Sequence, residues 1–315
     1  MSRTYKVTGI NLKGMPMGES DRLLTILTRE RGLIRAVAPG ARKHVSKLGG
    51  RSGLFVVNDL LISQGKSLDR ISQAETIESY PGLSQSLGKL TASQYLAELV
   101  LGQALSQHPQ EDLFCLFTEH LSRLERSPNL HTLPLLAHAT FHLLALAGIA
   151  PQVQACSITQ QPLAPNFQDS SWRVGFSTVA GGIVDLAALK DLAAQQASPG
   201  ISLPPQRSSV AEKIDNSYQV VTLPQKLPRL SAQLDATQLA LLQQLAQPDL
   251  PLEMTSLEML PLASSPLRPN PNSSSETAWI AVERILRQYT QYHFEQPIRS
   301  AALIDTCFVS ASLAP

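Results

Sequence analysis

Polar and apolar residues alternate through the first 80 positions of the chain, which is the pattern of β-strands with one buried face. The runs are rich in Val, Ile, Leu and Thr, and glycine or proline stands in the breaks between them. The pattern predicts strands over residues 4–13, 21–28, 33–38, 54–63 and 70–79. Five short strands with glycine at their bends are typical of an OB-type barrel, whose open face commonly binds oligonucleotides.

After residue 82 the apolar residues recur at intervals of three and four instead of two, which indicates amphipathic helices. Leu83, Leu87 and Leu90 begin this pattern. Further helices are predicted over residues 110–126, 133–147 and from 275 or 276 to 294. The predicted fold class is therefore α+β, with a five-stranded barrel followed by a mainly helical domain.

Two segments in the second half of the chain are rich in Pro, Ser, Gln and Asn, over residues 198–230 and 261–275. Such a composition buries too little apolar surface to offset chain entropy, so we expect loops or linkers there. A short helix is predicted between them, over residues 235–247.

Residues 133–151 form an apolar run long enough to be compared with a membrane span. His138, Thr140 and His142 interrupt the run and flanking anchors are missing, so a buried helix is favoured. The N-terminal residues alternate and lack the apolar region of a signal peptide. The chain has three widely spaced cysteines, Cys115, Cys156 and Cys307. An odd number at such spacing does not suggest a disulfide framework and favours a reducing compartment, so we expect a cytoplasmic protein.

Charge is distributed unevenly, although the whole chain has a net charge of +1. Residues 1–80 hold 13 Lys and Arg against 7 Asp and Glu, whereas residues 81–315 hold 13 against 18. A local basic excess attracts polyanions, and glycine lets the backbone approach a phosphate closely. We predict salt-sensitive, non-specific DNA contacts, with a solvated loop as the alternative, for the cations of residues 35–51: Arg35, Arg42, Lys43, Lys47 and Arg51.

Aromatic side chains on which single-stranded bases stack are scarce in the predicted barrel, where only Tyr5, Phe55 and Tyr80 are available. Each is expected to pack in the core or at a domain interface. Contacts to the phosphate backbone should then dominate over base stacking.

The sequence predicts no catalytic residue. Its close carboxylate pairs are Glu19 with Asp21, which favours a structural turn, and Glu111 with Asp112. Residues 82–90 resemble a phosphate-binding loop but have five residues between the glycines where the Walker motif has four.

His138 and His142 lie four residues apart and face the same side of the predicted helix. The motif is HATFH and not HExxH, so it supplies no general base for a metal-bound water. Core or interface histidines are favoured, and no metal ligand is predicted.

Several short motifs occur in an order and spacing that resemble the RecO family of bacterial recombination mediators. They are GESDRLL at 18–24, APGARK at 38–43, YLAEL at 95–99 and ERILRQYTQYHFEQPIRS at 283–300. The resemblance implies an N-terminal OB-fold and a helical domain. It also implies binding of single- and double-stranded DNA, strand annealing, and help in loading RecA onto DNA coated by single-strand-binding protein, without a catalytic reaction.

The resemblance also implies a zinc site in many relatives, made from a CxxC pair and two later cysteines. Here Cys156 occupies the first position, but Thr159 stands at the second, and Asp185 and Ala188 follow the later glycine pair. Structural zinc normally has four Cys or His ligands. We therefore predict a degenerate, metal-free zinc-finger-like region and no cofactor.

The partners that the resemblance implies are RecR and the C-terminal tail of single-strand-binding protein, with RecA engaged indirectly. A short acidic, hydrophobic tail requires an apolar pocket rimmed by a cation. Candidate rim residues in the helical domain are Arg123, Arg126, Arg284 and Arg287, although each could equally be a plain surface charge.

The predicted organisation has an OB-fold DNA-binding domain over residues 1–80 and a helical domain over 81–150 and 276–315. The zinc-finger-like subdomain takes residues 151–197, and a Pro/Ser-rich insertion with a short helix takes 198–275. The predicted function is that of a non-enzymatic recombination mediator in DNA repair. An adaptor that binds a peptide or RNA is the main alternative, and a nucleic-acid hydrolase is a third.

Overall fold

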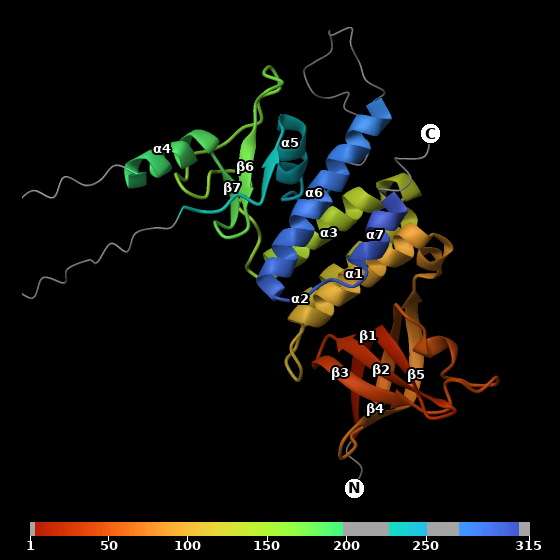
Figure 1. Ribbon diagram of the computed structural model, residues 1–315. Helices are drawn as coiled ribbons and strands as arrows, with labels where there is room; N and C mark the ends of the chain where they lie inside the picture. The colour runs from red at the N-terminus through yellow and green to blue at the C-terminus, as the bar shows by residue number, and fades with distance from the viewer. Residues whose placement is uncertain (1–3, 198–226, 251–270, 309–315) are drawn as a thin grey trace, which may run out of the picture. The chain divides into compact units, whose positions relative to one another are not determined.

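The computed structural model describes residues 4–197, 227–250 and 271–308 (Figure 1). The chain divides into two compact units. The first consists of Met1–Pro151 and Thr237–Pro315 and holds a barrel and a helical bundle, whereas the second is Gln152–Ala236.

The N-terminal strands close into a five-stranded barrel in the order β1-β2-β3-β5-β4, which confirms the OB-type prediction. A short parallel pairing between β3 and β5, at Ala36 with Asp69 and Val37 with Arg70, closes it. The strand bounds agree with the prediction to within two residues except for β1, which is longer and carries a register shift between Asn11 and Lys13. The strands are β1 (Thr4–Met17), β2 (Asp21–Thr28), β3 (Gly32–Ala38), β4 (Val56–Ser63) and β5 (Asp69–Ser79).

Alternate residues of the strands fill the interior of the barrel, as the period of two requires. On β3, for example, Ile34 and Ala36 are buried while Arg35 between them is exposed. The residues of this core cluster are Val7, Leu24, Ile26, Ile34, Ala36, Ala38, Ala41, Leu60, Ile62 and Ile71.

The turn before β3 joins the barrel to the helical bundle. Gly32 has a φ of +59°, and a Cβ atom there would lie 2.1 Å from the main-chain oxygen of Leu105. The same oxygen accepts a hydrogen bond of 2.9 Å from the Leu33 N–H. Phe55 packs against Phe117 with ring centroids 6.3 Å apart, which confirms its predicted packing role.

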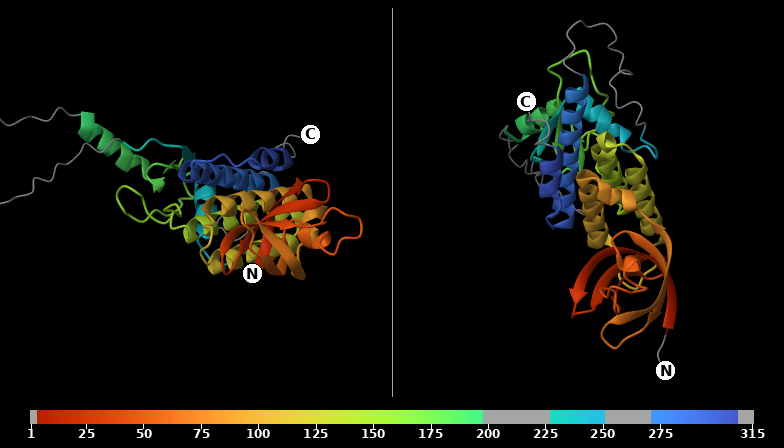
Figure 2. Two further views of the ribbon diagram at one scale, coloured as in Figure 1. Left: turned by 90° about the horizontal axis from the view of Figure 1, so that it is seen from below. Right: turned by 90° about the vertical axis from the view of Figure 1, so that its right-hand side faces the viewer.

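The bundle is built from α1 (Leu87–Gln103), α2 (Glu111–Arg126), α3 (Thr132–Leu146), α6 (Pro271–Phe294) and α7 (Ala301–Phe308). Helix α3 packs against α1, α2 and α6, and α7 packs against α1. The right-hand view of Figure 2 shows the barrel at the ends of α1 and α2. A short helix, α5 (Ala236–Gln244), occupies the range predicted for it.

Three helical features differ from the prediction. Helix α6 begins at residue 271, so the last residues of the linker predicted over 261–275 are helical and the rest lie outside the described residues. Helix α7 was not predicted, and neither was α4 (Leu186–Ala197) in the second unit. Among the described helices, none has both the length and the apolar character that crossing a membrane requires.

The second unit is a three-stranded sheet in the order β7-β6-β8, with the helix α4 (Leu186–Ala197) after β7. Its strands are β6 (Val174–Ser177), β7 (Gly182–Val184) and β8 (Ala232–Leu234). Strand β8 follows the Pro-rich range, of which residues 198–226 lie outside the described residues. None of these three strands was predicted.

Candidate nucleic-acid interface

The segment between β3 and β4 carries four of the five predicted DNA-binding cations. We call residues 39–53 the basic loop. Arg42, Lys43 and Lys47 are exposed, and Arg51 is half-buried. Ala41 is the loop residue that is buried in the barrel core. The fifth cation, Arg35, projects from the exposed side of β3.

The start of the basic loop is held by the turn between β1 and β2. The Asp21 carboxylate accepts a hydrogen bond from the Gly40 N–H at 2.7 Å. This bond is the main reason why the pKa of Asp21 is lowered from its ordinary value, and the nearby charges of Arg70 and Lys43 act in the same direction. Asp21 therefore has the structural role in a turn that the sequence favoured.

Arg42 is tied to the same turn through two groups. Its N–H donates to the main-chain oxygen of Ser20 at 2.9 Å, and its Nη1 donates to the oxygen of Gly18 at 3.0 Å. Lys43 follows at once, and its N–H donates to the Gly40 oxygen at 3.0 Å. The backbone at Arg42 and Lys43 is thus ordered before any ligand arrives.

The end of the basic loop is pinned by two buried asparagines. The Asn11 amide donates to the main-chain oxygens of Arg51 at 2.8 Å and Gly53 at 2.9 Å. Asn58 donates to the same Arg51 oxygen at 3.0 Å. Both asparagines are fully buried, so these bonds are shielded from water. Nothing in the sequence pattern marked Asn11 or Asn58 as supports of the loop.

The five predicted DNA-binding cations differ in the charged groups that surround them. Within the described residues, none of them takes part in an ion pair. Lys43, like Arg70, acts electrostatically on Asp21. Lys47 and Arg51 instead line a hollow of about 800 Å³, and its walls also carry the carboxylates of Glu30, Asp59 and Glu75.

The aromatic side chains of the barrel have partners within the protein. The Tyr5 ring lies under the Arg31 guanidinium, 4.2 Å from it, and its hydroxyl bonds to Asp69. Tyr80 is buried, and its hydroxyl donates to the Thr118 oxygen at 3.4 Å. These positions favour contact with phosphates over stacking of bases.

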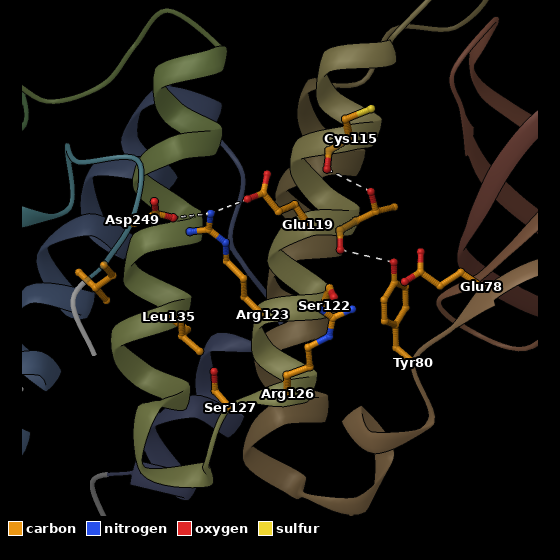
Figure 3. A pocket seen from close by; sticks show the side chains of 12 residues that line it. Glu78, Tyr80, Cys115, Glu119, Ser122, Arg123, Arg126, Ser127, Leu135 and Asp249 are labelled. Carbon is orange, nitrogen blue, oxygen red and sulfur yellow. Dashed lines mark hydrogen bonds and ion pairs between the residues drawn. The ribbon is translucent and has the colours of Figure 1, made fainter. Parts of the chain in front are cut away.

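A separate pocket of about 620 Å³ lies on the first unit beside α2 and α3 (Figure 3). Tyr80, Leu135 and Leu250 give it apolar surface. Arg123, one of the predicted rim residues, is already paired with Glu119, with Asp249 at 2.9 Å, and with the oxygen of Pro248 at 3.1 Å. Arg126 also lines the pocket, is exposed, and has no ion pair among the described residues.

The other two predicted rim residues lie elsewhere, on α6. The Arg287 side chain is only 12 % exposed and bonds both oxygens of Asp305 at 2.8 and 3.0 Å. It also bonds both oxygens of Glu283, at 2.5 and 3.0 Å. Burial opposes its charge, but these bonds raise the pKa of Arg287 above its ordinary value. Arg287 therefore joins α6 to α7.

Arg284 approaches the same carboxylate more loosely, with its Nε 3.7 Å from Asp305, and is half-exposed. The structure thus places Arg123 and Arg126 at one pocket and Arg284 and Arg287 at the α6–α7 contact. The four arginines do not form a common rim.

The zinc-finger-like region holds Cys156 in a hydrogen-bonded setting. The Asp185 N–H donates to its sulfur at 3.3 Å. Burial alone would raise the pKa of this thiol, but hydrogen bonds from Asp185 and Thr159 lower it. The other three positions of the four-cysteine zinc pattern hold Thr159, Asp185 and Ala188, which offer a hydroxyl, a carboxylate and a methyl group. These residues do not fit a structural zinc ion.

Comparison with known proteins gives consistent matches along the chain. A family model described as "Recombination protein O N terminal" matches residues 1–80, and one described as "Recombination protein O C terminal" matches residues 84–215. Two similar proteins are named "DNA repair protein RecO". The one from Nostoc sp. strain PCC 7120 is 53 % identical over 98 % of each chain, and that from Synechococcus elongatus is 44 % identical over 100 % of this chain and 99 % of its own.

Proposed function

The chain belongs to the RecO family of DNA repair proteins, and on that basis we propose that it is a non-catalytic mediator that anneals complementary DNA strands. It would also assist the loading of RecA on DNA coated by single-strand-binding protein. The proposed place of action is the cytoplasm, because chromosomal DNA is the substrate. No cofactor takes part in this activity.

The observation that carries the proposal is the basic loop, whose ordered backbone presents unpaired cations on an OB-type barrel. Cations that neutralise phosphates release condensed counterions and lower the repulsion between two complementary strands. Because phosphates are common to both forms, this mode of binding serves single- and double-stranded DNA alike. Arg42 and Lys43 contribute first, followed by Lys47, Arg51 and Arg35.

The pocket beside α2 and α3 is the proposed site for the C-terminal tail of single-strand-binding protein. Tyr80, Leu135 and Leu250 offer apolar contacts, and Arg126 offers a free cation for the terminal carboxylate. Tethering by this tail would raise the local concentration of the protein on coated DNA. RecR is the further proposed partner, and RecA is engaged indirectly.

The test is annealing of complementary oligonucleotides at several salt concentrations, with the variant that combines Arg42→Ala and Lys43→Ala. We expect wild-type annealing to fall steeply with salt and the variant to anneal at least about tenfold more slowly. The matched control combines Arg173→Ala and Lys190→Ala, which removes the same charge from exposed positions of the second unit. Equal annealing by the two double variants would refute the proposed interface. Binding of RNA without annealing of DNA would support the adaptor alternative.

A further inference from the structure

Three histidines of the helical bundle meet at one point, away from the basic loop. His120 comes from α2, and His138 and His142 come from successive turns of α3. One ring nitrogen of each lies within 4.8 Å of a ring nitrogen of the other two. Within the described residues, this is the one group of three or more His, Cys, Asp or Glu side chains close enough to share an ion.

His120 is the residue that ordinary core packing does not explain. It is 2 % exposed, and neither of its ring nitrogens has a hydrogen-bond partner. The Nδ1 of His138 is also buried without a partner. Buried polar atoms are nearly always paired, so unpaired nitrogens that face other imidazoles call for a shared ligand.

The orientation of the two α3 histidines is set by the chain that follows α5. The main-chain oxygen of Gln247 lies 2.9 Å from His138 Nε2 and 3.0 Å from His142 Nε2. A carbonyl oxygen only accepts, so each Nε2 carries the hydrogen, and on His138 the lone pair stays on the unpartnered Nδ1. Metal-binding histidines commonly donate their second nitrogen to a carbonyl in this way. His142 also has a hydrogen bond to the main chain of Leu245, which an ion would have to compete with.

Protonation and local charge also suit a metal cation. Burial lowers the pKa of His120 to about 2 and that of His138 to about 4, so both rings keep their lone pairs at neutral pH. The charged groups that act on the cluster are Arg123, Glu119 and Asp249. Because Arg123 is paired with both carboxylates, these three groups sum to a charge of −1 (Figure 3).

We infer that His120, His138 and His142 form a binding site for a first-row transition-metal dication, with zinc as the favoured ion. A tetrahedral site with metal–nitrogen distances of about 2.0–2.1 Å accepts three imidazoles and leaves a fourth position for water. The ion cross-links α2 to α3 within the helical bundle. His142 is half-buried, so it is the member of the cluster that solvent reaches. The site shares no residue with the degenerate finger or with the predicted DNA contacts.

The experiment uses the full-length chain without an affinity tag, stripped with a chelator and dialysed. Titration with ZnCl₂ is expected to give one equivalent bound and a rise in melting temperature, since binding to the folded state stabilises it. CoCl₂ is the spectroscopic probe. It is expected to give the visible bands of nitrogen-ligated cobalt without the charge-transfer band of a thiolate ligand.

The main variant is His142→Gln, because this half-buried position tolerates substitution better than the enclosed His120. We expect it to bind Zn²⁺ more than about tenfold more weakly than wild type, with its melting temperature no longer responding to the metal. His120→Gln should do the same if it folds. The matched control is His108→Gln, at an exposed position before α2, and Cys156→Ser tests the degenerate finger.

The assignment fails if wild type binds no Zn²⁺, or if His142→Gln binds it as tightly as His108→Gln does. It also fails if Cys156→Ser abolishes binding or if the cobalt spectrum shows a thiolate ligand. Loss of binding in His142→Gln with retention in both controls supports it.

Discussion

The Asn11 side-chain amide donates to the main-chain oxygen of Arg51 at 2.8 Å, from a position on β1 that is fully buried. A strand of the barrel thereby fixes the backbone of a predicted DNA-contacting residue. The cations of the basic loop are presented on a backbone held at both ends, by Asp21 at the start and by Asn11 at the finish.

We predict that Asn11→Asp destabilises the barrel, because an ionised carboxylate cannot donate to the Arg51 and Gly53 oxygens and places a charge in the core. The expected loss is about 1–3 kcal/mol in the free energy of unfolding. Urea denaturation measures it, with Asn129→Asp at an exposed position as the control. Equal stability of the two variants would show that the two amide bonds do not hold the loop.

The second prediction concerns acid stability. The folded-state pKa of Asp21 is lowered from 3.8, chiefly by the Gly40 N–H, so its ionised form stabilises the folded state. This contribution is present above pH 3.8 and is lost as the pH falls through the folded-state pKa. In Asp21→Asn the amide oxygen still accepts from Gly40, but the charge is absent.

Denaturation midpoints of wild type and Asp21→Asn should therefore converge as the pH falls from about 5 to 3, because only wild type loses this contribution. Glu19→Gln provides the control at the neighbouring carboxylate. A constant difference between wild type and Asp21→Asn over this range would contradict the assignment.

The third prediction concerns the join between α6 and α7. Arg287→Met leaves the Glu283 carboxylate, 3 % exposed, without its cation and frees Asp305. Removing one partner of a buried ion pair costs about 3–5 kcal/mol. Thermal unfolding of Arg287→Met should show the loss, whereas the half-exposed control Arg284→Met should lose less than about 1 kcal/mol. Comparable melting temperatures for the two variants would show that the bonds of Arg287 to Glu283 and Asp305 do not stabilise the contact between α6 and α7.

The fourth prediction tests the proposed tail pocket. Arg126→Glu reverses the exposed cation at its edge, so binding of a peptide with the acidic C-terminal sequence of single-strand-binding protein should weaken roughly fivefold, equivalent to ~1 kcal/mol. Fluorescence anisotropy of a labelled peptide measures this. Arg284→Glu makes the same charge change at the α6–α7 contact and should leave affinity unchanged. If Arg284→Glu weakened binding and Arg126→Glu did not, the tail-binding site would lie at α6 and not at this pocket.

Local patterns in the sequence predicted most of the architecture because each was repeated over several residues. The alternation through residues 4–79 predicted all the strands of the barrel. The apolar stripe of α2 predicted its buried face, which includes Phe114, Phe117 and Leu121. The strands of the second unit and helix α7 were missed because each is short, and β8 pairs with β6 from far along the chain. Helix α4 was also missed, in the segment assigned as a degenerate finger.

The candidate sites depended more strongly on long-range contacts. The sequence identified the basic residues but not the asparagines that hold their backbone. It listed four arginines together as candidate rim residues, but Arg123 and Arg126 line the pocket, whereas Arg284 and Arg287 lie at the contact between α6 and α7. It paired His138 with His142 through helical spacing, whereas His120 joins them only because α2 packs against α3.

The amino-acid order alone was enough to predict the strands of the barrel and most helices, to locate the concentration of positive charge, and to indicate the family. Those properties follow from the period of apolar residues and from composition, which act over a few neighbouring positions. Folding in three dimensions was needed to establish which cations remain without an ion pair, which arginines pair with carboxylates, and which histidines lie close together. Such outcomes depend on distances between residues remote in the chain, and a one-dimensional pattern does not contain those distances.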